Sequence, residues 1–158
     1  MVVVGFILTV GKVCADETKI GYVSTERILR ESEPAKAAEA RMEAEFSQRR
    51  KDLQDFAAKI KSTAEKLDKD SPVLSETDRL KRQRELADMD QDFQRKQRAY
   101  REDVSQRMNE ETSKVSERAN KIIKQIAESE KYDAILQDGV YFSPRIDITE
   151  KVMKALNK

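Results

Sequence analysis

The feature that most constrains this chain is a span without glycine that runs from Tyr22 to Asp138. Only Pro34 and Pro72 interrupt it as prolines, and an apolar residue recurs at every third or fourth position among Ala, Glu, Lys, Arg, Gln, Asp and Ser. This spacing is typical of an amphipathic helix, and a proline near the middle ends one helix and lets another begin. The sequence therefore predicts a solvated hairpin of two long helices.

The two predicted helices cover residues 35–70 and about 75–130, with a turn at residues 71–74 and a capping-box-like restart at Ser75. At 1.5 Å per residue, they would be roughly 50 to 80 Å long. Their apolar seam has coiled-coil steps of three and four residues, but Gln97 and Glu111 fall where an apolar residue is expected. We therefore expect a weakly packed, flexible arm, with an ordinary structural coiled coil as the alternative. The seam residues are Met42, Phe46, Leu53, Phe56, Ile60, Ala64, Leu67, Leu86, Met89, Phe93, Tyr100, Val104, Met108, Val115, Ala119, Ile122 and Ile126.

The segments that flank the hairpin predict short strands and helices. Residues 19–23 form a strand and residues 26–31 a short helix, capped by Ser24 or Thr25. Two apolar strands joined at Asp138–Gly139 predict a β-hairpin, residues 145–148 a further short strand, and Thr149 the cap of a last helix. The predicted fold class is mainly α with a small β body from which the long antiparallel hairpin projects.

This body, residues 16–33 and 131–158, is too small to bury a robust core within one chain. Domains of this size usually need disulfides, a metal or oligomerisation, and the body has neither cysteine nor histidine. We therefore expect an obligate oligomer in which several chains share one core. The residues assigned to that core are Tyr22, Ile28, Ile135, Leu136, Tyr141, Phe142, Ile146 and Ile148.

The first fifteen residues are predicted to be an export signal. Val2 to Val10 are almost all apolar, and Val13 and Ala15 fit the small-residue positions of a cleavage site before Asp16. The apolar run is too short to span a bilayer as a helix, although no Lys or Arg precedes it. A buried strand is the alternative. Cleavage after Ala15 would remove Cys14 and leave a cysteine-free chain, as suits an oxidising compartment.

The composition excludes several classes of function. The chain has no His and one Cys, so histidine acid–base chemistry, a cysteine nucleophile and a Cys/His zinc site lack their residues. No Gly-rich phosphate loop is possible, which removes the common nucleotide-binding motifs. Net charge is only +1, which disfavours nucleic-acid binding. We predict no enzymatic activity, no cofactor and no metal.

The hairpin tip is locally basic. From Arg49 to Glu85 there are eleven Lys and Arg against eight Asp and Glu, a balance of +3. Such a tip could steer acidic clients or touch anionic lipid or lipopolysaccharide. The alternative is a solvated face held by ion pairs within each helix. The candidate binding residues are Lys59, Lys61, Lys66, Lys69, Arg79, Lys81, Arg82 and Arg84.

Four aromatic residues of the arms have two possible roles. Phe46, Phe56, Phe93 and Tyr100 either fill the seam between the two helices or line a cavity and contact apolar segments of a client.

Four segments at the two ends of the hairpin are distinctive: Lys19-Ile20-Gly21-Tyr22-Val23-Ser24, Glu33-Pro34-Ala35-Lys36-Ala37-Ala38, Tyr132-Asp133-Ala134-Ile135-Leu136 and, most specifically, residues 140–149. Together they resemble the Skp/OmpH family, whose members are periplasmic chaperones of outer-membrane proteins.

The resemblance implies a homotrimer with a β-barrel-like body and three hairpins around a cavity that holds an unfolded outer-membrane β-barrel protein. It implies a periplasmic location, no nucleotide and no catalytic residues. Capture would then be driven by many weak contacts, since no ATP-binding motif is present. The alternative from another class is a structural or adaptor coiled coil of the cell envelope, which predicts a better-filled seam.

Overall fold

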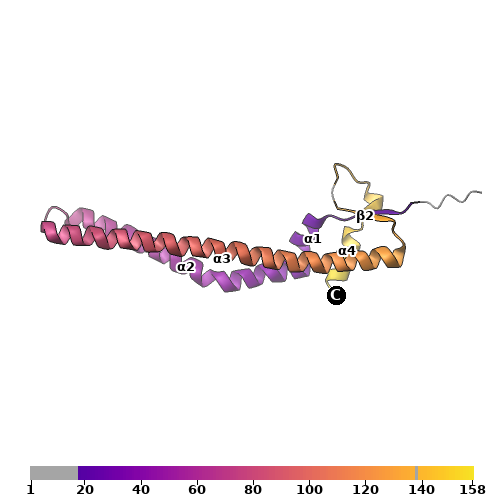
Figure 1. Ribbon diagram of the computed structural model, residues 1–158, viewed down its shortest axis with the longest axis horizontal. Coiled ribbons are helices and arrows are strands. Elements are labelled where there is room, and N and C mark those ends of the chain that lie inside the picture. Colours follow the sequence, from indigo (N-terminus) through magenta and orange to yellow (C-terminus); the bar gives the residue numbers. More distant parts are fainter. Residues whose placement is uncertain (1–17, 138) are drawn as a thin grey trace, which may run out of the picture.

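The computed structural model describes residues 18–137 and 139–158, and its dominant feature is a helical hairpin that projects from a small body (Figure 1). Helix α2 covers Glu33–Asp70 and helix α3 covers Glu76–Glu130. They run antiparallel, and the tip at residues 71–75 lies at the end of the molecule away from the body (Figure 1). The predicted fold class is confirmed: the structure is mainly helical with a small two-stranded sheet. The predicted export signal lies outside the described residues.

Serine side chains cap the N-termini of both helices of the hairpin and of the short helix that precedes them. Ser32 Oγ accepts a hydrogen bond from the amide of Ala35 at 3.3 Å, and Pro34 occupies the first turn of α2. Ser75 Oγ accepts from the amide of Asp78 at 3.1 Å, which confirms the predicted restart after the tip. Ser24 caps α1, Thr25–Glu31, in the same way.

The sheet of the body joins the two ends of the described chain. Strands β1, Ile20–Tyr22, and β2, Ala134–Leu136, pair in parallel, with Gly21 opposite Ile135. The β-hairpin prediction is wrong over the described residues, because β2 pairs with β1 across the whole helical hairpin and residues 140–142 form no strand. Phe142 instead stacks on Tyr22, with ring centroids 3.6 Å apart.

The predicted strand at residues 145–148 is also wrong. Pro144–Ile146 form a short 3-10 helix, η1, and Asp147 makes only an isolated bridge to Tyr22. Proline and the capping serine before it favour a turn here over an extended strand.

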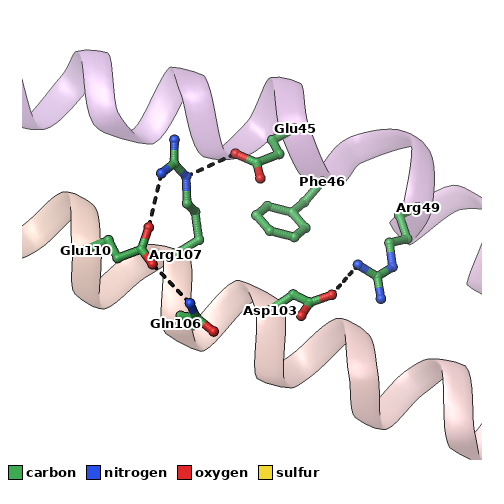
Figure 2. A pocket seen from close by; sticks show the side chains of 7 residues that line it. All are labelled: Glu45, Phe46, Arg49, Asp103, Gln106, Arg107 and Glu110. Atoms are coloured by element: carbon green, nitrogen blue, oxygen red, sulfur yellow. Dashed lines mark hydrogen bonds and ion pairs between the residues drawn. The ribbon is translucent and has the colours of Figure 1, made fainter.

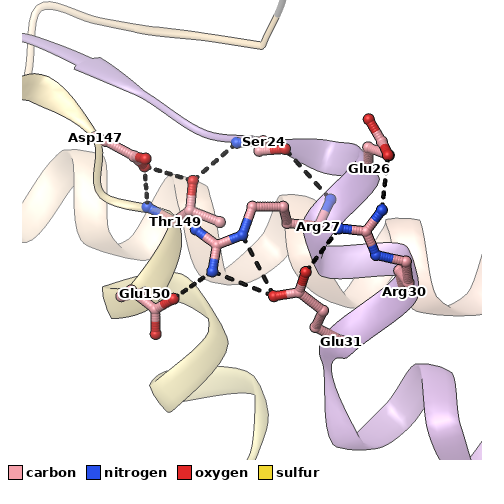
Figure 3. A network of polar contacts seen from close by, with 8 residues as sticks. All are labelled: Ser24, Glu26, Arg27, Arg30, Glu31, Asp147, Thr149 and Glu150. Atoms are coloured by element: carbon pink, nitrogen blue, oxygen red, sulfur yellow. Dashed lines mark hydrogen bonds and ion pairs between the residues drawn. The ribbon is translucent and has the colours of Figure 1, made fainter. Parts of the chain in front are cut away.

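The last helix, α4, covers Thr149–Leu156, and its cap differs from the prediction. Thr149 is the first helical residue, and its amide donates to Asp147 Oδ1 at 2.8 Å. The Thr149 hydroxyl also donates to Asp147 and accepts from the amide of Ser24 at 2.9 Å (Figure 3). Thr149 is fully buried, so its side chain ties α4 to the start of α1 instead of capping its own helix.

The core of the molecule lies where α1 and α4 pack on the body end of α3. Arg27 reinforces this packing, since it donates to Glu31 on α1 and to Glu150 on α4 (Figure 3). The guanidinium groups of Arg30 and Arg27 hold the pKa of the Glu31 carboxyl below its ordinary value. The buried apolar residues of this core are Val23, Ile28, Ala119, Ile123, Ile148, Val152, Met153 and Leu156.

Candidate functional site

The hairpin is well packed near the body and loosely packed beyond it. The buried residues of α3 are Glu111, Val115, Ala119 and Ile123, all in the half nearer the body. None of the residues of α3 from Glu76 to Glu110 is buried. On α2, Leu67 near the tip is buried, but apart from it the outer half of the hairpin buries no apolar side chain and so gains little from apolar burial.

Sixteen of the seventeen predicted seam residues are buried or half-buried, and one is not. Met108 is 50% exposed, and Glu111, one turn along α3, is buried instead. Met108 borders a cavity beside Ala38 and Met42 of α2 and stays exposed there, whereas the ion pair with Arg41 holds Glu111 against α2.

Glu111 is the one charged residue among the described parts of the chain that is buried. Its carboxylate lies 2.5 Å from Arg41 Nη2 on α2, 2.8 Å from Lys114 Nζ and 3.4 Å from Arg107 Nη2. Hydrogen bonds from Lys114 and Arg41 lower the pKa of Glu111 from 4.5 to about 2. The carboxylate is thus charged and compensated, as a buried acid must be.

The four arm aromatics form two pairs across the hairpin. Phe46 meets Tyr100 edge to face with ring centroids 5.9 Å apart, and Phe56 meets Phe93 at 6.2 Å. A basic side chain lies over one ring of each pair: Arg49 over Tyr100 at 5.9 Å and Lys96 over Phe56 at 4.9 Å. Only Phe46 of the four is buried, so part of each pair remains in contact with solvent.

Shallow cavities lie beside these aromatic pairs. One of about 340 Å³ is lined by Phe46 together with polar side chains of both helices, including Arg49, Asp103 and Arg107 (Figure 2). A second, of about 320 Å³, lies against Leu53, Phe56 and Ala99. Both present a ring edge between charged groups, a surface that suits weak contacts with varied apolar side chains.

The eight basic residues of the tip differ in whether they form ion pairs. Arg79 pairs with Glu76 at 3.0 Å and Arg82 pairs with Asp70 at 2.8 Å across the turn. Within the described segments, the other six make no ion pair, and all six are exposed. They are Lys59, Lys61, Lys66, Lys69, Lys81 and Arg84. Val73 is also exposed at this tip.

The residues assigned to the body fall into two groups. Ile28 and Ile148 are buried in the core of this chain, and Tyr22, Ile135, Phe142 and Ile146 are half-buried. Leu136 is exposed on the sheet, and Tyr141 is 82% exposed in the segment that follows it. The sheet thus carries apolar side chains that this one chain leaves uncovered.

Among residues 18–137 and 139–158 there is no cluster of acidic, cysteine or histidine residues that could hold a metal ion. Over the same residues, no helix has both the length and the apolar character to cross a bilayer.

Sequence reasoning missed the Glu111 cluster and the ion pairs beside it. The signal was present, because an acid in a seam position with bases at i−4 and i+3 often marks a buried, paired charge. The partner on α2 could not be identified before the register of the two helices was known.

Comparisons with known proteins cover nearly the whole chain. The family described as "Outer membrane protein (OmpH-like)" matches residues 19–156. The chain is 28% identical to the Chaperone protein Skp of Vibrio cholerae serotype O1 over 140 residues, which covers 87% of this chain and 83% of that protein. It is also 28% identical to the Chaperone protein Skp of Photorhabdus laumondii over 148 residues, 92% of this chain and 88% of that one.

The fold is shared with a crystal structure of an OmpH-like outer membrane chaperone from Caulobacter crescentus. The TM-score is 0.76 at 22% identity, over 89% of this chain and 85% of that one. The curated relatives are named as chaperones and not as enzymes, in agreement with the prediction of no enzymatic activity. With a family match from residue 19 to residue 156 and the same fold, the chain belongs to the OmpH-like family of outer-membrane chaperones, in which the resemblance to Skp/OmpH proteins had placed it.

Proposed function

We propose that this chain is an ATP-independent periplasmic holdase. Three copies would assemble through their bodies, and their three hairpins would enclose an unfolded outer-membrane β-barrel protein and prevent its aggregation before insertion. The observation that carries the proposal is the contrast between a packed base and a loosely packed outer hairpin in a member of this family. Such a hairpin can adapt to clients of different size.

The exposed sheet supports assembly through the body. A two-stranded sheet is only marginally stable alone, and here Ile20 and Leu136 stand exposed on it, next to the exposed Val140 and Tyr141. Strands and apolar side chains of neighbouring copies would complete this sheet and cover these residues. We propose that residues 16–33 and 131–158 form this trimerisation body, that residues 34–130 form the arm, and that residues 1–15 are a signal peptide cleaved after Ala15.

The aromatic pairs of the arm are the second argument, because they support the proposal that client capture needs no nucleotide. Each aromatic pair offers a partly exposed ring beside a shallow cavity, and each contact of this kind is weak. Three arms around one client would add many such contacts by avidity. The client keeps its disorder, so binding costs little chain entropy. Release follows when insertion into the membrane stabilises the client more than binding does.

The tip supports an electrostatic role in capture or in contact with an anionic surface. Its six exposed basic side chains without ion pairs in the described chain would attract acidic client segments, anionic lipid or lipopolysaccharide. Replacing Lys69, Lys81 and Arg84 by Gln should slow client capture at low salt. Replacing Lys121 and Lys124, exposed bases of the inner half of α3, by Gln provides the control. Equal capture rates for both variants at every salt concentration would contradict a role for the tip.

Light scattering tests the holdase function directly. An unfolded outer-membrane protein is diluted from urea into buffer with or without the purified chain, in the absence of ATP. We expect full suppression of aggregation near one client per three chains. No suppression, or suppression only with ATP, would contradict the proposal. A structural coiled coil of the envelope would leave aggregation unchanged, so the same assay separates the two functions.

A further inference from the structure

Three ion pairs between α2 and α3 lie in a row along one edge of the hairpin. Arg41 pairs with Glu111 at 2.5 Å, Glu45 with Arg107 at 3.1 Å, and Arg49 with Asp103 at 2.5 Å. Figure 2 shows the second and third of these pairs bridging the two helices. On each helix the three residues are four positions apart, which is about one turn. We call this set of six residues the ionic ladder.

The sign of the charge alternates along both sides of the ladder. Helix α2 presents Arg, Glu and Arg, and α3 presents Glu, Arg and Asp to meet them. A slip of one turn in one direction would place Arg41 opposite Arg107 and Glu45 opposite Asp103. A slip in the other direction would place Glu45 opposite Glu111 and Arg49 opposite Arg107. Either slip thus replaces three attractive pairs with two repulsive ones.

The ladder lies where the apolar seam is buried on one side only, because Met42 and Phe46 of α2 are buried beside it whereas α3 buries no apolar residue between Asp103 and Glu111. Its inner end is the buried Glu111, and beyond it no residue of α3 up to the tip is buried. The turn at the tip restrains the register, but it is about 20 residues from Arg49, roughly 30 Å along the helix. A seam of scattered apolar residues tolerates a slip of one turn, whereas alternating charges penalise it.

We propose that the ionic ladder specifies the register of α2 against α3. It does so chiefly by penalising the slipped alternatives, and only secondarily by adding stability, because two of its three pairs lie on the surface and exposed ion pairs contribute little. Correct register is what brings Phe46 to Tyr100 and Phe56 to Phe93. The inference concerns the hairpin alone and holds whether or not the arms bind a client.

A composition-preserving swap tests this inference. The double variant Glu45→Arg with Arg107→Glu makes α2 basic and α3 acidic along the whole ladder, so native and slipped registers both pair opposite charges. We expect the amide resonances of residues 41–49 and 103–111 to double or broaden in this variant. We also expect their hydrogen exchange to be roughly tenfold faster than in the unmodified chain. The unmodified full chain should show one set of resonances.

Two further variants separate register from simple loss of stability. Arg107→Glu also places an acid beside Glu110 and the buried Glu111 on its own helix, so the milder swap of Arg49→Asp with Asp103→Arg is measured in parallel. This milder swap leaves one repulsive pair in each slipped register instead of two. We therefore expect a second, weaker set of amide resonances. The control swap, Glu43→Arg with Arg50→Glu, reverses an exposed pair within α2 and should leave one set of resonances. A single set of resonances in both ladder swaps, even with faster exchange, would overturn the inference.

Discussion

Ile28 provides a quantitative test of where the stability of this chain resides. Its side chain is among the largest fully buried ones of the described residues, 1% exposed, in the core formed by α1, α3 and α4. The substitution Ile28→Ala removes three carbons, about 2.4 kcal/mol of transfer free energy at about 0.8 kcal/mol per carbon. The cavity left in a core that cannot collapse adds to this, so we expect a loss of about 3 kcal/mol in the free energy of unfolding.

This loss would be large for so small a core, because domains are stable by only about 5 to 15 kcal/mol in total. The assay is urea unfolding at fixed protein concentration, followed by tyrosine emission because the chain has no Trp. Ile28→Val, which removes one carbon, should cost about 1 kcal/mol. Leu29→Ala is the control, since Leu29 is the next residue of α1 and only half-buried. A loss for Ile28→Ala no greater than that for Leu29→Ala would refute the assignment of the core.

Three further predictions concern single residues. The pKa of Glu111 falls from 4.5 to about 2 on folding, so its ion pairs stabilise the fold above about pH 4.5, and this contribution is lost as the pH falls toward 2. The urea midpoint of unfolding of Glu111→Gln should therefore be lower than that of the unmodified chain at pH 7. It should also change less between about pH 5 and pH 2, and a parallel pH dependence of the two midpoints would contradict this. Lys131 ends α3 with φ of 56° in the left-handed region, so Lys131→Gly should raise stability by about 1 kcal/mol, seen as a higher melting temperature. A side-chain carbon at Gly21 would lie 3.2 Å from the Tyr132 ring, so Gly21→Ala should lower stability by about 1 kcal/mol in the same assay, and an unchanged melting temperature would refute the close contact.

Local chemistry made the hairpin predictable from the sequence. The absence of glycine, the three-and-four spacing and the signal around Pro72 and Ser75 all act within a few residues, and they fix the helices to within about two residues of their observed ends. The apolar periodicity likewise identified every buried apolar residue of α2 except Ala35 and Ala38 near its start. Family membership followed from the segments at the two ends of the hairpin.

The features that could not be predicted from the sequence depend on contacts between residues far apart in the chain. The Asp138–Gly139 signal favours a local hairpin, but β2 instead pairs with β1, more than a hundred residues earlier in the chain. The burial of Glu111 depends on Arg41, which comes from the other helix, and the role of Thr149 depends on Ser24. In each case the deciding partner is brought close only by the tertiary fold. From the sequence, the four aromatic residues of the arm have two candidate roles, filling the seam between the helices or contacting a client. Their part in client binding stays a prediction.

We propose above all that three copies of this chain hold one unfolded client between flexible arms. Native mass spectrometry of the chain mixed with an unfolded outer-membrane protein tests it most directly. We predict a free species of three chains and a complex of three chains with one client, both formed without nucleotide. A stable folded monomer at micromolar concentration, or a trimer that retains no client, would contradict the account.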